Sequence, residues 1–382
     1  MANRKIPFNW PYMTGRELDY IVQAHSRGHL AGDGPFTQRC HAWLEQRIGC
    51  RKALLTPSCT AALEMAALLL EVEEGDEVIM PSFTFVSTAN AFVLRGGIPV
   101  FVDIRPDTLN IDEARIEEAI TPRTKAIVPV HYAGVACEMD AIMAIATRHN
   151  LAVIEDAAQG AMATYRGRAL GSIGDLGALS FHETKNVISG EGGALLVNSE
   201  KFVFRAQILR DKGTDRIRFL RGEVDKYTWQ DKGSSYLPSE LIAAFLWAQF
   251  EEAERITRSR LDSWNHYHES FELLERRGLL RRPIIPEGCS HNAHMYYVLL
   301  TPDVDRAAVL AALVNEGITA VFHYVPLHDS PAGHRYGRAN GDLIVTDDLS
   351  SRLIRLPMWV GLQEADQNRV VDALTRILTF CT

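Results

Sequence analysis

Residues 179–198, LSFHETKNVISGEGGALLVN, place a single lysine between a short apolar run and a glycine-rich turn that leads into a second apolar run. The two runs have the length and composition of buried strands, and the glycines mark the turn between them. Lys185 therefore stands at the end of a strand. Most lysines are solvated surface charges, and this window alone leaves that interpretation open. The alternative is a buried amine that forms a Schiff base with a carbonyl cofactor.

Similar apolar runs recur upstream of this stretch, separated by segments of helical spacing such as TAALEMAALLL and MDAIMAIATRH. Runs this continuous indicate strands that are covered on both faces. The sequence therefore predicts an α/β fold with a mostly parallel central sheet and helices on both of its faces. Ligands bind such sheets at the carboxyl ends of the strands. The runs are EVIMPS, PVFVDI, AIVPVH, LAVIEDA, GALSFH and GALLVN.

The pattern changes after about residue 250, where apolar residues at spacings of three and four predict a long helix. These residues are Leu261, Trp264, Tyr267, Phe271 and Leu274. MYYVLL and AVFHYV predict two strands that flank a helix near 305–316, and an amphipathic helix ends the chain. We expect a large domain over residues 1–250 and a smaller α+β domain over 251–382. No Pro- or Ser-rich linker separates them, so they should pack closely.

Composition excludes several classes of protein. The 382 residues carry a formal net charge of −8, which argues against nucleic-acid binding. The N-terminus lacks the apolar core of a signal peptide, and no stretch approaches the roughly 18–20 apolar residues of a membrane span; we expect a cytoplasmic protein. The cysteines lack CxxC spacing, which predicts reduced thiols and no metal site. They are Cys40, Cys50, Cys59, Cys137, Cys289 and Cys381.

Two adjacent acids follow a buried-strand pattern in LAVIEDAAQG, residues 151–160. Carboxylates at the end of a buried strand need a partner. One interpretation is that Glu155 or Asp156 caps a following helix. The other is that Asp156 pairs with the ring nitrogen of a pyridine cofactor and keeps it protonated, as pyridoxal phosphate chemistry requires. In that case Asp156 and Lys185 emerge at the same edge of the sheet.

A phosphate site is predicted where TPSCTAALEMAALLL opens a helix, because free N–H groups at a helix N-terminus attract anions. Ser58, Cys59 and Thr60 would face the phosphate; an ordinary Ser/Thr cap is the alternative. PSFTFVSTANA ends a strand with two aromatics, one of which would stack on a flat ring unless both belong to the core. Ser180 adds a hydroxyl on the strand of Lys185. A pyridoxal phosphate site on this fold needs these groups in a fixed order along the chain. The order is the phosphate-binding helix start, the aromatic, the acid, the hydroxyl and the lysine, and this sequence has it.

The chain resembles the DegT/DnrJ/EryC1/StrS family of sugar aminotransferases, which are pyridoxal-phosphate enzymes of fold type I. The resemblance spans nearly the whole chain, from GDGPFTQRCHAWLEQRIG to the C-terminal helix, and includes VIEDAAQG, SFHETKNVISGEGG and FHYVPLH. It implies that Lys185 forms the Schiff base, that Asp156 pairs with the pyridine nitrogen and that Gln159 faces the ring hydroxyl. It also implies that Phe85 stacks on the ring. The residues implied to hold the phosphate are Cys59, Thr60 and Ser180.

The resemblance further implies transamination of the C4 ketone of a nucleotide-linked 4-keto-6-deoxysugar, with dTDP-4-keto-6-deoxyglucose as substrate and L-glutamate as amino donor, for surface polysaccharide synthesis. Family members are homodimers with shared sites, closed by a segment that here reads KGSSYLPSELIAA. Ser235 stands there where many members have asparagine, and Leu237 where they have arginine or another polar residue, so a partner contact to the phosphate stays open. Dehydratases on this fold replace the lysine with histidine, so Lys185 favours transamination.

The remaining candidates would bind substrate. His182 would assist beside the reacting centre, unless it is a packed histidine. His323, Tyr324 and His328 in FHYVPLH would contact the sugar nucleotide, unless they are a strand and its turn. Arg218 belongs to the charged loop RDKGTDRIRFLRGEVDKYTW, whose guanidinium groups suit a diphosphate or else form a solvated face. A 3-aminotransferase, a dehydratase or a cofactor-binding regulator without turnover are the alternative functions.

Overall fold

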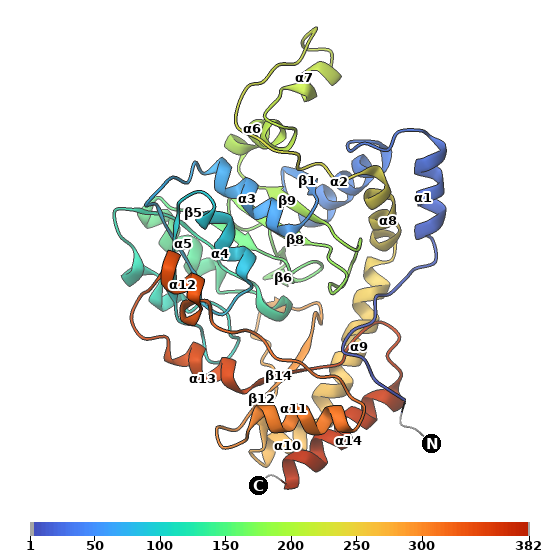
Figure 1. Ribbon diagram of the computed structural model, residues 1–382, viewed down its shortest axis with the longest axis vertical. Coiled ribbons are helices and arrows are strands. Elements are labelled where there is room, and N and C mark those ends of the chain that lie inside the picture. Colours follow the sequence, from blue (N-terminus) through green and yellow to red (C-terminus); the bar gives the residue numbers. More distant parts are fainter. Residues whose placement is uncertain (1–3, 381–382) are drawn as a thin grey trace.

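The structure is a computed structural model that describes residues 4–380, and its main sheet has eight strands (Figure 1). Its strands are β1 (Lys52–Thr56), β2 (Glu77–Pro81), β3 (Ile98–Val102), β4 (Thr124–Ile127), β5 (Ala152–Asp156), β8 (Leu176–Ser180), β9 (Gly193–Val197) and β13 (Arg338–Ala339). Their order across the sheet is β1-β9-β8-β5-β4-β2-β3-β13. Neighbours from β13 to β8 run parallel, and β9 runs antiparallel to β8 and β1. The predicted α/β fold with a mostly parallel sheet is confirmed.

Helices cover both faces of this sheet because each strand turns alternate side chains to opposite sides. In β2, Ile79 packs into one layer, whereas Val78 and Met80 pack into the other. The first layer contains α1 (Glu17–Ser26), α2 (Pro35–Ile48), α5 (Met139–His149) and α8 (Glu240–Glu251). The second contains α3 (Cys59–Leu69), α4 (Val86–Val93) and α6 (Glu200–Arg210). All six strands predicted between residues 50 and 200 are present, as are the helices predicted from TAALEMAALLL and MDAIMAIATRH.

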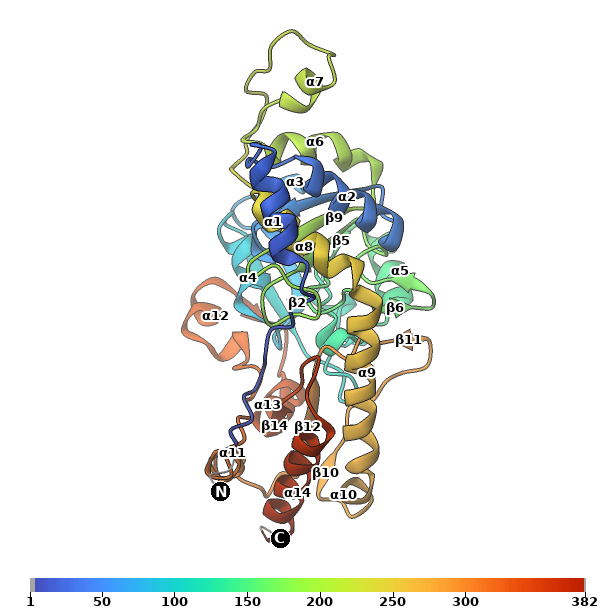
Figure 2. The same ribbon diagram turned by 90° about the vertical axis from the view of Figure 1, so that its right-hand side faces the viewer.

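A second sheet of three antiparallel strands follows, with helices on one face. The strands are β10 (Leu280–Arg281), β12 (Tyr296–Leu300) and β14 (Leu353–Leu356). The helices are α9 (Ala253–Ser270), α10 (Glu272–Arg276), α11 (Arg306–Asn315) and α14 (Glu364–Phe380). In Figure 2, α9 runs from the level of the large sheet down to the small one. The predicted long helix is thus α9 with α10, the helix near 305–316 is α11, and the final helix is α14.

The strand predicted from AVFHYV is wrong. Val321 forms only an isolated bridge with Arg355, and the residues after it follow no regular strand. A strand would send the neighbouring side chains of His323 and Tyr324 to opposite faces. Here both line the same cavity, so the backbone leaves the extended pattern after the bridge. The third strand of the small sheet is β14, which contributes LIRL, a run that an internal arginine interrupts.

The two parts of the molecule share a buried cluster. The face of the small sheet opposite its helices packs Tyr297 and Leu299 against Phe83 and Tyr132 of the large part. Two segments also cross between the parts. The short strand β13 pairs with β3 at the edge of the large sheet, and Ile6 near the N-terminus bridges Ile318. Close packing follows from these contacts, and the domain division near residue 250 stays a prediction.

Shorter elements connect these layers. A third sheet joins β11 to β6 and β7, and segment 211–236 projects from the body of the molecule around α7 (Figures 1 and 2). The short strands are β6 (Thr164–Tyr165), β7 (Arg168–Ala169) and β11 (Cys289–Ser290), and the short helices are α7 (Arg216–Leu220), α12 (Pro331–Tyr336), α13 (Ile344–Arg352), η1 (Glu113–Arg115), η2 (Glu117–Ala119), η3 (Tyr132–Gly134) and η4 (Leu327–Asp329).

Among residues 4–380, no helix combines the length and the apolar composition that crossing a membrane requires. The five cysteines in this range carry free thiols, and four of them are buried. Cys381 lies outside the described residues.

Candidate active site

A cavity of about 570 Å³ opens between the end of β5, the end of β8 and the N-termini of α3 and α4. The small sheet and the segment before η4 supply its opposite wall. Most of the residues singled out from the sequence meet here, although they are spread over much of the chain. Those that line the cavity are Ser58, Cys59, Thr60, Phe85, Asp156, Gln159, Ser180, His182, Lys185, His323 and Tyr324.

Lys185 enters the cavity from the tight loop that joins β8 to β9. The loop is closed by backbone hydrogen bonds from Ser189 to Phe181 (2.7 Å) and from Lys185 to His182 (2.9 Å). The lysine is partly exposed because its side chain faces the cavity, yet the surrounding protein removes bulk water from the amine. This desolvation lowers the pKa of Lys185, against the opposing influence of Cys59 and Asp156. A larger neutral fraction makes the amine a better nucleophile and proton acceptor near neutral pH.

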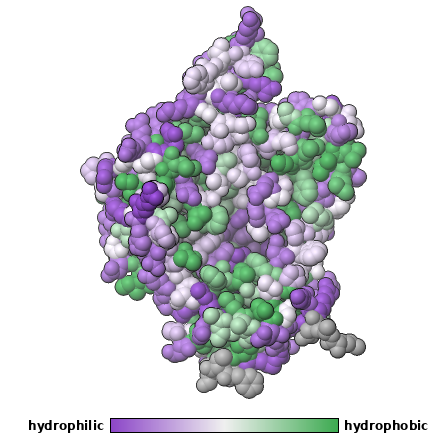
Figure 3. All heavy atoms as spheres, in the orientation of Figure 1, coloured by the Kyte–Doolittle hydropathy of each residue, from purple (hydrophilic) through white to green (hydrophobic). Residues whose placement is uncertain are grey.

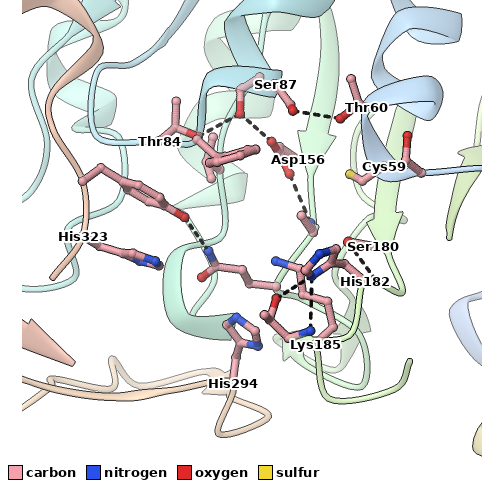
Figure 4. A pocket seen from close by; sticks show the side chains of 18 of the residues that line it. Cys59, Thr60, Thr84, Ser87, Asp156, Ser180, His182, Lys185, His294 and His323 are labelled. Carbon is pink, nitrogen blue, oxygen red and sulfur yellow. Dashed lines mark hydrogen bonds between the residues drawn. The ribbon is translucent and has the colours of Figure 1, made fainter. Parts of the chain in front are cut away.

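Asp156, the last residue of β5, is held by donors on both of its oxygens. Thr88, in the first turn of α4, donates to Oδ2 (2.7 Å), and the backbone N–H of Ala158 donates to Oδ1 (3.1 Å). Thr84 lies behind Thr88, with 2.8 Å between the hydroxyl oxygens (Figure 4). Because Thr88 donates to the carboxylate, its oxygen accepts from Thr84. Turns rather than a helix follow β5, so the carboxylate is not a helix cap.

Glu155, the other acid of the pair, has a structural role on the opposite side of the strand. Its carboxylate is fully buried and accepts hydrogen bonds from the backbone N–H groups of Gly171 (2.8 Å), Ile173 (2.5 Å) and Gly174 (2.7 Å). The His131 ring contacts it at 2.9 Å. Glu155 therefore holds the turn before β8, and the alternation of side chains along β5 leaves Asp156 facing the cavity.

The N-terminus of α3 forms the anion-binding end of the cavity. Ser58 caps the helix by accepting from the N–H of Ala61 (3.1 Å), and the first turn offers the N–H groups of Cys59 and Thr60. The Thr60 hydroxyl donates to Ser87 (2.8 Å), as Figure 4 shows. Burial raises the pKa of the Cys59 thiol well above its usual value, so the thiol stays protonated.

Gly193 lets β9 approach this helix end. A Cβ atom on Gly193 would lie 2.4 Å from the backbone of Ser58 and Cys59, a distance that no side chain tolerates. The last glycine of the GEGG stretch is therefore required by the close contact between β9 and α3. Ser180, at the end of β8, adds its hydroxyl to the same end of the cavity.

Gln159 and Tyr324 form a second polar group on the cavity wall. The side-chain carbonyl of Gln159 accepts from the N–H of Ala133 (2.6 Å), and its amide donates to the Tyr324 hydroxyl (3.1 Å). The ring of Tyr324 stacks on His323 at a centroid distance of 4.0 Å. Burial raises the pKa of Tyr324 to about 12, so its hydroxyl is a neutral donor. The group can orient a polar substituent of a bound ring.

His182 lines the cavity but is half exposed. Its Nδ1 accepts from the backbone N–H of Thr184 (3.2 Å), which places the proton of the neutral ring on Nε2. Nε2 lies 3.7 Å from a Glu191 carboxylate oxygen. This arrangement suits proton exchange with a ligand in the cavity, and the role of His182 stays a prediction.

Three residues predicted for the site lie outside the cavity. Ser235 is exposed and bridges Asp211, and Arg218 pairs with Glu223 (3.3 Å) on the projecting segment. His328 donates its backbone N–H to the Ser82 hydroxyl (3.0 Å), which in turn contacts the His328 ring (2.7 Å). Within one copy of the chain, none of the three can touch a ligand in the cavity, and their roles stay predictions.

Sequence reasoning also missed residues that line the cavity, among them Phe8, Thr88, His294 and Arg355. Thr88 lies in the quoted segment PSFTFVSTANA, and a hydroxyl at the start of a helix was an available signal. Arg355 was the one charge inside the apolar run LIRLPM. His294 is buried and contacts Asn186 (3.0 Å between Nδ1 and Oδ1), and burial lowers its pKa well below the usual value. Phe8 carried no local signal.

The chemistry of these groups fits pyridoxal phosphate. Lys185 supplies the amine that must bond the aldehyde, and Asp156 supplies the carboxylate for the pyridine nitrogen. The α3 N-terminus, with the hydroxyls of Thr60 and Ser180, supplies the donors for a phosphate. Figure 4 shows Asp156 and Lys185 reaching into the same space from different elements, with Cys59 and Thr60 at one end.

Comparison with known proteins gives the same assignment. Residues 11–375 match the model of the DegT/DnrJ/EryC1/StrS aminotransferase family. The chain is 34% identical to GDP-perosamine synthase of Caulobacter vibrioides, covering 96% of this chain and 97% of that protein. It is 32% identical to the spore coat polysaccharide biosynthesis protein SpsC of Bacillus subtilis, covering 98% of each.

A solved structure shares the fold over nearly the whole chain. The crystal structure of NtdA from Bacillus subtilis, which holds the bound cofactor PMP, has a TM-score of 0.85 and 28% sequence identity. The match covers 99% of this chain and 87% of that one. The chain therefore belongs to the DegT/DnrJ/EryC1/StrS aminotransferase family and is an aminotransferase that uses pyridoxal 5'-phosphate.

Proposed function

We propose that this enzyme transaminates the C4 ketone of a nucleotide-linked 4-keto-6-deoxysugar with L-glutamate as amino donor. The proposed substrate is dTDP-4-keto-6-deoxyglucose and the proposed product dTDP-4-amino-4,6-dideoxygalactose, for surface polysaccharide synthesis. The observation that carries the proposal is the placement of Lys185 and the Thr88-bound carboxylate of Asp156 in one cavity. Retention of lysine at position 185 favours transamination over dehydration.

The bound cofactor supplies an electron sink for the carbon that gains or loses the amine. Lys185 would move the proton at that carbon, since its lowered pKa gives it a neutral fraction. Asp156, fixed by Thr88 and Ala158, would keep the ring nitrogen protonated. The N-terminus of α3 would anchor the phosphate and Phe85 would cover the ring, so that the reacting carbon stays beside Lys185.

The substrate class is supported by the relatives and by the wall opposite α3. One relative is named for a GDP-linked amino sugar and another for polysaccharide biosynthesis. His323 and Tyr324 offer ring faces and a hydroxyl of the kind that binds sugars. His182 would assist proton exchange, and the clustered guanidinium groups around Arg218 of a second copy would meet the diphosphate. His328 would support the sugar-binding segment through Ser82.

A second copy of this chain is part of the proposal, because segment 211–236 projects from the molecule and leaves large apolar side chains exposed. Trp229 is 81% exposed and Leu220 56% exposed on it. Apolar side chains also gather over α1 and α8 (Figure 3), where Leu18 and Val22 are exposed. We propose a homodimer with shared sites, in which Ser235 of one copy approaches the phosphate of the other. Static light scattering on the purified protein tests the oligomeric state.

The test of the proposed reaction is product identification. The purified enzyme, with pyridoxal phosphate and L-glutamate, is incubated with dTDP-4-keto-6-deoxyglucose, and the sugar is analysed by NMR. An axial amine at C4 supports the proposal. An amine at C3, a dehydrated sugar or turnover only with a GDP-linked 4-keto sugar contradicts it. Lys185→Ala, which should bind cofactor weakly and not transaminate, controls for amination without the enzyme.

A regulatory protein that binds the cofactor without turnover is the alternative from another class. Such a protein would not respond to the amino donor. Addition of L-glutamate alone should convert the absorbance of the bound aldehyde cofactor to that of its amine form if the enzyme proposal holds. An unchanged spectrum favours the regulatory function.

A further inference from the structure

Arg355 is a buried cation for which the chain supplies no anion. It lies in β14, is 9% exposed and lines the cavity. No Asp or Glu oxygen lies within 4 Å of its guanidinium among residues 4–380. Its Nη1 contacts Nε2 of His323, whereas Nε is buried without any hydrogen-bond partner. A buried charge left unpaired is expensive, so such a group usually has a partner.

The neighbours of Arg355 are neutral. The guanidinium carbon stands 4.7 Å from the centre of the Phe8 ring, and a cation over an aromatic face is only partly compensated. Burial, together with Arg355 and Lys185, lowers the pKa of His323 to about 2, so this histidine is uncharged. The nearby Tyr132 and Tyr324 stay protonated because burial raises the pKa of each. The compensating charge must therefore come from outside the chain's own groups.

The free edge of the guanidinium has the geometry of a carboxylate site. His323 occupies Nη1, and the side formed by Nε and Nη2 carries no hydrogen bond to a described residue. That side presents two parallel N–H groups, which match the two oxygens of a carboxylate. His323 and His294 lie across the cavity from Cys59 and Thr60 (Figure 4). Arg355 is thus placed at the end opposite the phosphate site, near enough to Lys185 to act on its charge.

We propose that Arg355 binds the α-carboxylate of the amino donor through Nε and Nη2. This inference rests on the proposed function, which brings two substrates to one cavity. In an amino acid the carboxylate is one bond from the carbon that bears the amine, so it lies beside Lys185 when that carbon reacts. In a nucleotide sugar the diphosphate is attached at C1, across the ring from C4. Of the two substrates, only the donor carries an anion adjacent to its reacting carbon.

The two half-reactions separate this role from a structural one. Arg355→Gln should raise the L-glutamate concentration needed for half-maximal conversion of the bound cofactor about 30- to 100-fold, the worth of a charge-assisted two-point contact. Conversion by the 4-amino sugar, which has no carboxylate, should change less than about threefold. Arg355→Lys, which keeps the charge and loses the planar fork, should fall between wild type and Arg355→Gln.

Arg352 offers a matched control three residues earlier. Its guanidinium pairs with Asp348 and donates to the Leu300 carbonyl (2.6 Å), away from the cavity. Arg352→Gln should leave both half-reactions unchanged. Equal losses on glutamate and on the amino sugar in Arg355→Gln, or a loss on the sugar alone, would overturn the assignment. The second of these outcomes would place an anionic group of the sugar at Arg355.

An equilibrium measurement completes the test without turnover. Glutarate, a dicarboxylate without an amine, should bind the wild-type holoenzyme in a calorimetric titration. It should bind Arg355→Gln more weakly and Arg352→Gln with the affinity of the wild type. Equal binding to wild type and Arg355→Gln contradicts the inference. A wild-type enzyme that binds glutarate through Arg355 and reacts with glutamate, but not with the 4-keto sugar, would refute the proposed sugar substrate and leave the donor site standing.

Discussion

Thr88→Val tests the support of Asp156 with a nearly isosteric change. The substitution replaces the hydroxyl that donates to Asp156 Oδ2 at 2.7 Å by a methyl group of similar volume. Thr88 is fully buried, so water cannot readily take the place of the lost donor. The carboxylate keeps only the backbone N–H of Ala158 as its donor. Asp156 should then hold the protonated ring nitrogen less firmly.

The size of the effect follows from the charge on the acceptor. A hydrogen bond to a charged group contributes about 1.5–3 kcal/mol. If all of this is lost from the transition state, kcat/KM falls about 10- to 150-fold, because each 1.36 kcal/mol corresponds to about a factor of ten. Steady-state assays at saturating cofactor measure the loss. Thermal unfolding measured in parallel shows whether the fold is retained.

Thr84→Val is the matched control, since Thr84 contacts Thr88 at 2.8 Å and makes no contact with Asp156. It removes a buried hydroxyl of the same kind, one step further from the carboxylate. We expect a stability loss of about 1 kcal/mol, as for an ordinary neutral hydrogen bond, and activity within about threefold of wild type. If the two variants lose activity equally, the threonines act only by packing and the reasoning about Asp156 is refuted.

Two further predictions concern Glu155 and Lys185. Glu155→Gln should lower the free energy of unfolding by about 3 kcal/mol, because an amide NH2 would replace one oxygen that now accepts from backbone N–H groups. Asp156→Asn should instead lose mainly activity. Urea unfolding and kcat/KM are measured for both variants, and equal losses in stability and in activity would contradict this division. Burial lowers the pKa of Lys185 below its ordinary 10.5. Between that lowered pKa and 10.5, the unfolded chain binds more protons than the folded one. The stability of the cofactor-free enzyme should therefore rise with pH through this window. Lys185→Met should remove this contribution to the rise of the unfolding free energy with pH, as measured by urea unfolding. If the variant keeps the wild-type dependence on pH, the amine is not desolvated.

The fold was predictable where apolar runs were continuous. Each of the six runs between residues 50 and 200 became a strand because burial on both faces leaves an uninterrupted apolar signal. Prediction failed where the chain serves the cavity. AVFHYV has the composition of a strand, yet it forms none, and His323 and Tyr324 both face the cavity. LIRL forms a strand although Arg355 interrupts its apolar run. β13 is only two residues long, too short for any periodicity.

The site divides in the same way. Asp156 ends a buried strand and Lys185 lies in the loop that follows another, so the local pattern placed them at one edge of the sheet and the structure brings both to the cavity. Phe8 and Arg355 reach the cavity through contacts between segments far apart in the chain, for which a single sequence carries no distance information. The donor on Asp156 lay in a quoted segment, but the hydroxyl of Thr88 is equally typical of an ordinary helix start.

The charges that line the cavity also bear on the proposed homodimer. Its lining contains two acids, Asp156 and Glu191, and two cations, Lys185 and Arg355, but neither acid pairs with Arg355. Once Arg355 is assigned to the donor carboxylate and Lys185 to the cofactor aldehyde, the cofactor phosphate is opposed within the described cavity lining by helix N-termini alone. The projecting segment 211–236 carries cations in exposed local pairs, such as Arg218 with Glu223, which contribute little to stability where they stand. Cations held loosely at the tip of a projection are therefore available to the site of another copy, and this is the arrangement that our homodimer proposal requires.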